Sequence, residues 1–116
     1  MRRVIAFQLG GVYAWARVRS VPRDGTHLLI AQDEKEITVV TAPENLASLD
    51  AIEVNRDRWR MIAIDPTTPF YCVGFIATIS ARLAAEGLDI LVVSTYSRDV
   101  FFVKDEETER AIEILT

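Results

Sequence analysis

The fold is decided by residues 59–115, which read WRMIAIDPTTPFYCVGFIATISARLAAEGLDILVVSTYSRDVFFVKDEETERAIEIL. The stretch opens with an alternating strand, Trp59–Asp65, and continues with a helix predicted over Phe70–Glu86. Thr68 suits the N-cap of this helix, because its hydroxyl can accept a hydrogen bond from a free N–H of the first turn. The helix is predicted to end at Gly87, since glycine enters left-handed geometry most cheaply.

The rest of the stretch predicts two strands and a second helix. Leu88–Tyr96 is apolar and β-branched, which favours a buried strand, and Val100–Lys104 is predicted to return beside it. The last helix is expected to begin at the acidic residues from Asp105, because negative charge is favourable near the positive end of the helix dipole. Its apolar face has the spacing i, i+3, i+4, i+7 and comprises Thr108, Ala111, Ile112 and Leu115. The resulting order, β-α-β-β-α, lacks the last strand of the βαββαβ ferredoxin-like unit.

Two sequence motifs in this stretch carry a resemblance to a known family. STYSRDVFFVK (Ser94–Lys104), followed by ERAI (Glu109–Ile112), resembles the closing motif of small stand-alone ACT-domain proteins. More narrowly, it is similar to the ACT modules of the cytosolic arginine sensor family, whose motif reads approximately S-T-Y-x-T-D-Y-x-L-V-K and then E-R-A-I. The preceding helix, with Gly74 inside it and LAAEGL (Leu83–Leu88) at its end, is similar to the earlier part of that pattern.

The resemblance implies an α+β fold of ferredoxin-like ACT type, with antiparallel sheets and helices on one face. It implies an ACT domain at residues 58–116 and a degenerate, β-rich ACT-like half at residues 1–57, the two forming one inseparable unit. ACT domains typically bind amino acids or other small metabolites and regulate another activity. We therefore expect a non-catalytic regulatory module for a small molecule, first of all an amino acid. The alternative is a structural or protein-interaction module without a ligand.

The first half of the chain reads as strands with little helix. The predicted strands are Val4–Leu9, Val12–Arg19, His27–Gln32 and Ile37–Ala42, followed by one or two helical turns at Pro43–Ser48 and an irregular polar segment at Asp50–Asp57. The pair Gly10-Gly11 is predicted to break the first strand. We expect Val4–Leu9, or part of Val12–Arg19, to occupy the place of the missing strand of the second half, because an open sheet edge is an aggregation hazard.

The best candidate site is the turn before the Phe70–Glu86 helix, because a helix N-terminus offers free N–H groups to an α-carboxylate. Asp65 could face an α-amine, and hydroxyls lie close by in sequence. By family resemblance, the end of the following strand lies near this turn. The predicted ligand-binding residues are Asp65, Thr67, Thr68, Phe70, Gly74, Ser94, Thr95 and Asp99. In the competing interpretation Thr68 only caps the helix and Asp65 only ends a strand.

Composition excludes several function classes. The chain has 116 residues, half of them hydrophobic, so it can bury a core. Its net charge of −4 and pI near 5.0 argue against nucleic acid as a partner. The beginning, Met1–Ala16, mimics a signal peptide, but polar and glycine residues interrupt its apolar run. No stretch approaches the roughly 20 apolar residues of a membrane span. The lone cysteine, Cys72, fits a reducing cytoplasm, and a cytoplasmic location is expected.

Catalytic and metal chemistry find little support in the sequence. Cys72 and His27 are far apart, and no oxyanion-hole motif accompanies them, so we expect no enzyme. A single cysteine excludes an internal disulfide and a cysteine zinc cluster, and no metal or cofactor is expected. The strands Leu88–Tyr96 and Val100–Lys104 are apolar on both faces, which suggests that a second sheet or a second subunit covers one face. A homodimer is the first expectation.

Overall fold

A computed structural model describes residues 6–64, 75–96 and 99–116. The described residues form two compact units. The C-terminal unit joins the first ten residues of the chain to Arg60–Thr116, and the N-terminal unit comprises Gly11–Trp59.

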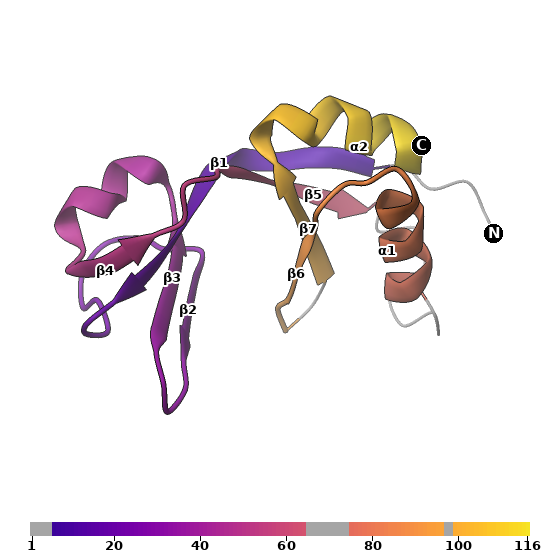
Figure 1. Cartoon of the computed structure of the whole chain (residues 1–116). Helices are drawn as coiled ribbons and strands as arrows, with labels where there is room; N and C mark the ends of the chain where they lie inside the picture. Colours follow the sequence, from indigo (N-terminus) through magenta and orange to yellow (C-terminus); the bar gives the residue numbers. More distant parts are fainter. Residues whose placement is uncertain (1–5, 65–74, 97–98) are drawn as a thin grey trace. The chain divides into compact units, whose positions relative to one another are not determined.

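The C-terminal unit is built from strands and two helices (Figure 1). Its elements are the first residues of β1 (Ala6–Val18), then β5 (Trp59–Ile64), α1 (Phe75–Ala85), β6 (Leu91–Ser94), β7 (Asp99–Lys104), the 3₁₀ helix η2 (Asp105–Glu107) and α2 (Thr108–Leu115). Its strand order is β1-β5-β7-β6. A strand from the N-terminus therefore occupies the place beside β5, and the prediction that such a strand completes this half is confirmed.

The predicted break of this first strand is wrong. β1 continues through Gly10-Gly11 as one strand of 13 residues. Gly10 adopts a φ of 73°, which glycine tolerates because it has no Cβ, so the strand can pass through an irregular residue without ending. The glycine pair lies where the chain passes from one compact unit to the other.

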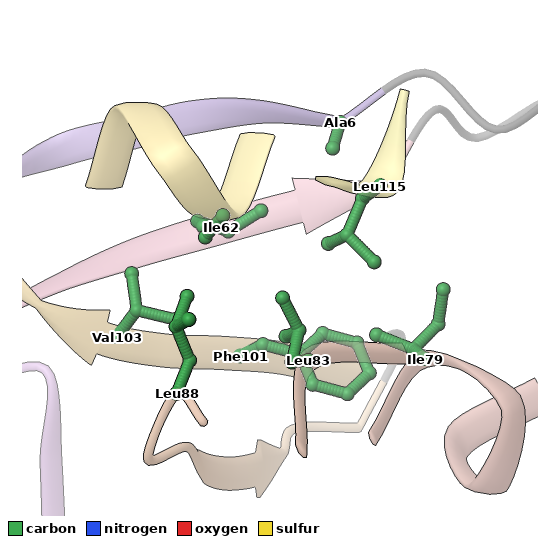
Figure 2. Packing of buried hydrophobic residues seen from close by; sticks show 9 residues of the cluster. Ala6, Ile62, Ile79, Leu83, Leu88, Phe101, Val103 and Leu115 are labelled. Atoms are coloured by element: carbon green, nitrogen blue, oxygen red, sulfur yellow. The ribbon is translucent and has the colours of Figure 1, made fainter. Parts of the chain in front are cut away.

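One apolar core holds the C-terminal unit together (Figure 2). Helices and strands both contribute, since α1 supplies Ile79 and Leu83 while β7 supplies Phe101 and Val103. The full set of buried core residues is Ala6, Ile62, Ile79, Leu83, Leu88, Phe101, Val103, Ala111 and Leu115. Burying one side chain of the size of leucine or phenylalanine contributes about 1.5–3 kcal/mol. The predicted apolar face of the last helix is confirmed, with three of its four members buried and Ile112 packed against the core.

The end of α1 is fixed by its glycine, as the sequence predicts. Gly87 has a φ of 76°, and its backbone N–H donates to the Ala84 carbonyl at 2.9 Å. The Leu88 N–H donates to the Leu83 carbonyl at 3.1 Å, which completes a Schellman motif. Leu88 and Leu83 both belong to the buried core. Leu88 therefore serves this turn, and strand β6 begins later than predicted, at Leu91.

Strand β7 is buried on both faces. Phe101 and Phe102 follow one another, so their side chains point to opposite faces of the sheet, and both are 0% exposed. On the side of Phe102, the neighbouring strand positions Val100, Val93 and Met61 are buried as well. This burial exists within a single copy of the chain, so the apolar second face does not by itself require a second subunit.

The N-terminal unit is a smaller sheet with one short helix. Its elements are the second part of β1, then β2 (Leu29–Gln32), β3 (Ile37–Thr41), the 3₁₀ helix η1 (Pro43–Ser48) and β4 (Ala51–Val54). β3 and β4 both pair with β1, and β2 pairs with β3, all antiparallel. The predicted strands at His27–Gln32 and Ile37–Ala42 are confirmed in shortened form, as are the helical turns at Pro43–Ser48.

Two predictions about element boundaries are wrong. The segment Asp50–Asp57, predicted to be irregular, contains strand β4, because pairing with β1 places Glu53 opposite Arg17 despite the polar sequence. The last helix does not begin as an α-helix at Asp105: the three acidic residues form η2, and α2 begins at Thr108. The Thr108 hydroxyl donates to the Asp105 carbonyl at 2.9 Å, across this junction.

The N-terminal unit has a small apolar core. Ala16, Val18 and Val39 are buried, and the half-buried Leu46 and Leu49 pack against them. The small side chains of β1 thus face η1 and the residue after it, in line with the close packing that their size predicts. No residue of η1 is fully buried, so this cluster is smaller than the core cluster of the C-terminal unit.

Candidate functional site

The described part of the predicted site lies at the turn end of the β6–β7 hairpin. Ser94 is the last residue of β6 and Asp99 the first of β7, and they are paired across the two strands. The Ser94 hydroxyl donates a hydrogen bond to the Asp99 carboxylate. Ser94 and Thr95 are exposed and Asp99 is half-buried. The structure therefore brings two predicted residues into direct contact, with Thr95 next to them in the chain.

The end of β5 lies at the same end of the sheet. Arg60, near the start of β5, forms an ion pair with Asp105, which directly follows β7. Because β5 and β7 are neighbours, this contact shows that they run in opposite directions. Ile64, the last residue of β5, and Asp99, the first of β7, are therefore found at one end of the sheet.

The remaining predicted residues lie outside the described residues. These are Asp65, Thr67, Thr68, Phe70 and Gly74, together with Cys72 and the start of the first helix. Their expected role at a helix N-terminus stays a prediction. The approach of β5 to the Ser94–Asp99 end of the sheet is the structural support for searching there.

His27 belongs to a polar cluster that anchors a loop. Its Nδ1 lies 2.8 Å from the hydroxyl oxygen of Thr41, a side chain that is 0% exposed. The Asn45 amide donates to the same hydroxyl at 2.9 Å and to the Thr26 carbonyl at 3.2 Å. The imidazole Nε2 lies 3.2 Å from the Asp24 carbonyl oxygen. These contacts give His27 a structural role, in which it fixes the loop between β1 and β2 on the end of β3.

The chain also contains hollows that the site prediction missed. One of about 290 Å³, here called the Trp15 hollow, is lined by side chains of the N-terminal unit that include Trp15, Arg17, Glu36, Thr38, Glu53 and Asn55. The alternation of Trp15, Arg17 and Arg19 along β1 was the available signal, because it places an aromatic ring and cations on one face of a strand. Within the described ranges, no group of three or more His, Cys, Asp or Glu side chains could hold a metal ion.

A comparison with family models decides the classification. Residues 54–116, which contain β5 to α2, match the model of the ACT domain. The chain belongs to the ACT domain family. The match covers more than half of the chain and includes Ser94, Thr95 and Asp99. The resemblance predicted from the closing motif is thus confirmed at the level of the family. The narrower relation to the arginine sensor modules stays a prediction.

Solved structures share the fold of this ACT-domain chain. A protein from Agobacterium tumefaciens is 22% identical, with a TM-score of 0.80 over 99% of this chain and 88% of its own. A Vibrio cholerae protein of unknown function, described as a possible transport protein, is 19% identical, with a TM-score of 0.75 over 97% and 88%. The aspartate kinase of Clostridium acetobutylicum, an allosteric enzyme, is 9% identical, with a TM-score of 0.66 over 97% of this chain and 33% of its own. These likenesses establish the α+β ACT fold.

No curated protein matches the chain at a significant level. Among the helices in the described residues, none is long and apolar enough to cross a bilayer.

Proposed function

We propose that this ACT domain is a non-catalytic regulatory module that binds a small molecule, first of all an amino acid, at the turn end of the β6–β7 hairpin. The observation that carries the proposal is the contact between Ser94 and Asp99 inside the region that matches the ACT domain. The contact pairs a hydroxyl donor with a carboxylate at one end of the sheet, where a ligand ammonium group would find an acceptor.

The proposed site extends from this hairpin to the segment that follows β5. Asp99 would pair with the ligand's α-ammonium group, and Ser94 and Thr95 would supply hydroxyls. The free N–H groups of a helix N-terminus would donate hydrogen bonds to the α-carboxylate, as the sequence predicts for Thr68 and its neighbours. The other proposed ligand-binding residues are Asp65, Thr67, Phe70 and Gly74.

Regulation would operate through a shift in population between two arrangements. A ligand that binds one arrangement more tightly raises its share, and by no more than its difference in affinity allows. In the proposed form the module acts as a homodimer in the cytoplasm and passes the signal to a separate protein. The proposal involves no cofactor.

A thermal-unfolding screen of the purified chain against the twenty amino acids tests the proposal. A ligand present at about 100 times its Kd adds about 2.7 kcal/mol to the free energy of unfolding. At about 4–8 °C per kcal/mol for a domain near this size, the midpoint should rise by more than ten degrees. A selective shift with one amino acid supports the proposal, whereas no shift with any amino acid at millimolar concentration contradicts it.

A matched pair of variants locates the site. Asp99→Ala should abolish the ligand-induced shift. Asp89→Ala, which removes an exposed carboxylate near the opposite end of β6 that pairs with Lys104 at 3.3 Å, should leave it intact. Equal shifts in the two variants would place the ligand elsewhere in the molecule.

The second candidate function is a protein-interaction module without a ligand. Tyr96, close to the same hairpin turn, is fully exposed, and an exposed aromatic side chain is a common anchor in protein interfaces. If this function holds, Tyr96→Ala should release a partner protein without changing the thermal midpoint. Under the first function, Tyr96→Ala should leave the ligand-induced shift in place.

A further inference from the structure

The Trp15 hollow lies on the face of the N-terminal sheet opposite its apolar core. Ala16 and Val18 of β1 point into that core, so the alternating residues Trp15 and Arg17 point to the other face. Arg17 is paired across the sheet with Thr38 of β3 on one side and with Glu53 of β4 on the other. The hollow is thus built on three adjacent, hydrogen-bonded strands.

One wall of the hollow is fixed by Asn55, which follows β4. Its backbone N–H donates to the Trp15 carbonyl at 2.9 Å. Its side-chain oxygen accepts two hydrogen bonds, from the Trp59 indole N–H at 3.2 Å and from the Asp57 backbone N–H at 3.0 Å. With its oxygen held in this way, Asn55 keeps a defined position beside the Trp15 side of the hollow.

The charges that line the hollow do not balance. Arg17 pairs with Glu53 at 3.4 Å, which leaves this pair neutral. Glu36 also lines the hollow, and none of the described residues forms an ion pair with its carboxylate. The Glu36 backbone N–H donates to Asp33, which orders the main chain at that point. The lining therefore carries one net negative charge and includes the aromatic residue Trp15.

We propose that the Trp15 hollow binds a small alkylammonium ion, whose charged group lies against the indole of Trp15 and pairs with the Glu36 carboxylate. An aromatic face attracts a cation within about 6 Å of its centre, and tryptophan is the strongest such ring. The Thr38 hydroxyl adds a hydrogen-bond acceptor for the ammonium group. A volume of about 290 Å³ suits a ligand smaller than the drug-sized molecules that typical pockets hold.

Two-dimensional amide NMR of the ¹⁵N-labelled full chain tests this site with n-butylammonium chloride as the probe. n-Butanol and sodium butyrate have the same chain length without the positive charge. The expected result is a saturable shift of the Trp15 indole N–H and the Asn55 amide with the ammonium probe at millimolar concentrations, and no saturable shift with the two controls. Equal responses to butanol, or movement of the Trp59 indole signal without that of Trp15, would overturn the proposal.

Two exposed glutamates provide the matched variants. Glu36→Gln should weaken binding of n-butylammonium by about two- to fivefold, because the exposed counter-charge is lost. Glu34→Gln removes a charge from the same turn, from a residue that does not line the Trp15 hollow, and should bind as the parent does. Unchanged affinity in Glu36→Gln, with its spectrum showing an intact fold, would refute the assignment. Asp99→Ala should not alter this binding, so the outcome is independent of the proposed regulatory site.

Discussion

The two units of this ACT-domain chain have strands in the same order and differ in what covers their sheets. The C-terminal unit has the order β6-β7-β5-β1, in which the first part of β1 is the edge strand. The N-terminal unit has the corresponding order β2-β3-β1-β4, in which the second part of β1 is an inner strand. In the C-terminal unit α1 joins β5 to β6 and α2 follows β7, whereas residues 19–28 contain no helix and η1 follows β3. The comparison supports the proposal of a degenerate ACT-like half for the part of residues 1–57 that lies in the N-terminal unit, while the first ten residues belong to the C-terminal unit. It also teaches that a sheet can keep its strand order with little helix cover.

The two units differ in what stabilises them: the C-terminal unit has a large apolar core, and the N-terminal unit has a smaller one with a hydrogen-bond network. Among the described residues, the core cluster of the C-terminal unit contains nine buried apolar residues, while the cluster beside η1 in the N-terminal unit contains three. In the N-terminal unit, the loop that stands in place of a helix is fixed by the hydrogen bonds of Thr41, His27 and Asn45. Such a network contributes less than a large apolar core and depends on every partner being present.

The largest expected effects come from removing the same side chain in each core. Leu83→Ala in α1 removes a fully buried leucine and should lower the free energy of unfolding by about 2–5 kcal/mol. Leu46→Ala in η1 removes a half-buried leucine, so about 1–2 kcal/mol is expected. Urea unfolding of both variants measures the difference. A loss for Leu46→Ala as large as that for Leu83→Ala would contradict the view that the C-terminal unit has the larger apolar core.

The next effect concerns the hydrogen-bond network of Thr41, His27 and Asn45. Thr41→Val keeps the shape of a side chain that is 0% exposed but removes the hydroxyl that His27 and Asn45 share. A loss of about 1–3 kcal/mol is expected, because buried polar groups are left without their partner. Thr38→Val on the same strand is the control and should change the free energy of unfolding by less than about 0.5 kcal/mol. Equal values in urea titrations would show that the network is not important for stability.

Two glycines, one in each unit, give a smaller contrast. Gly87→Ala should cost about 1 kcal/mol, because a φ of 76° is unfavourable for alanine although the added Cβ would meet nothing within 4 Å. Gly11→Ala has equal space and no positive φ, so the free energy of unfolding should stay the same or rise by up to about 1 kcal/mol. Differential scanning calorimetry distinguishes the two, and a loss at Gly11 as large as at Gly87 would contradict this explanation.

The smallest expected effect is a pH dependence in the β2–β3 turn. The Lys35 and Glu36 backbone N–H groups donate to the Asp33 carboxylate and lower its pKa below 3.8, since they favour its charged form. The stabilisation is fully present above the unfolded value and is lost as the pH falls through the lower folded pKa. NMR titration of the Asp33 carboxyl carbon should show a midpoint below 3.8, and a midpoint at or above that value would contradict these hydrogen bonds.

Much of the C-terminal unit could be predicted from sequence because its signals are local. The apolar alternation at Trp59–Ile64, the helix-ending Gly87 and the i, i+3, i+4, i+7 face of α2 each follow from short-range geometry. The strand that completes this unit was predicted because the second half lacks one strand of the ferredoxin-like unit, the N-terminus has one to spare, and an open sheet edge is an aggregation hazard. Ser94 and Asp99 were predicted from the family motif, and their contact follows from hairpin register.

The errors arose where long-range pairing overrides local preference. β4 has a polar sequence and becomes a strand because β1 offers it a free edge. The pair Gly10-Gly11 is typical of a strand end, yet β1 continues on either side of it. The Trp15 hollow was not predicted because its lining comes from β1, β3 and β4, whose register is not readable from one sequence. The second apolar face of β7 was predicted to be covered by a second sheet or a second subunit. Its residues are buried within one chain, and the homodimer stays a prediction.

The most direct test of the account is whether the first residues of β1 complete the C-terminal unit. Ala6→Asp places a carboxylate at a core position that is 6% exposed, whereas Gln8→Asp places one at an exposed position of the same strand. Hydrogen exchange by NMR should show that Ala6→Asp accelerates amide exchange in β5 by about 100-fold or more, as expected for a loss of roughly 3 kcal/mol. Gln8→Asp should change it little. Unchanged protection of β5 in Ala6→Asp, or equal losses in both variants, would contradict the claim that an N-terminal strand completes this ACT domain.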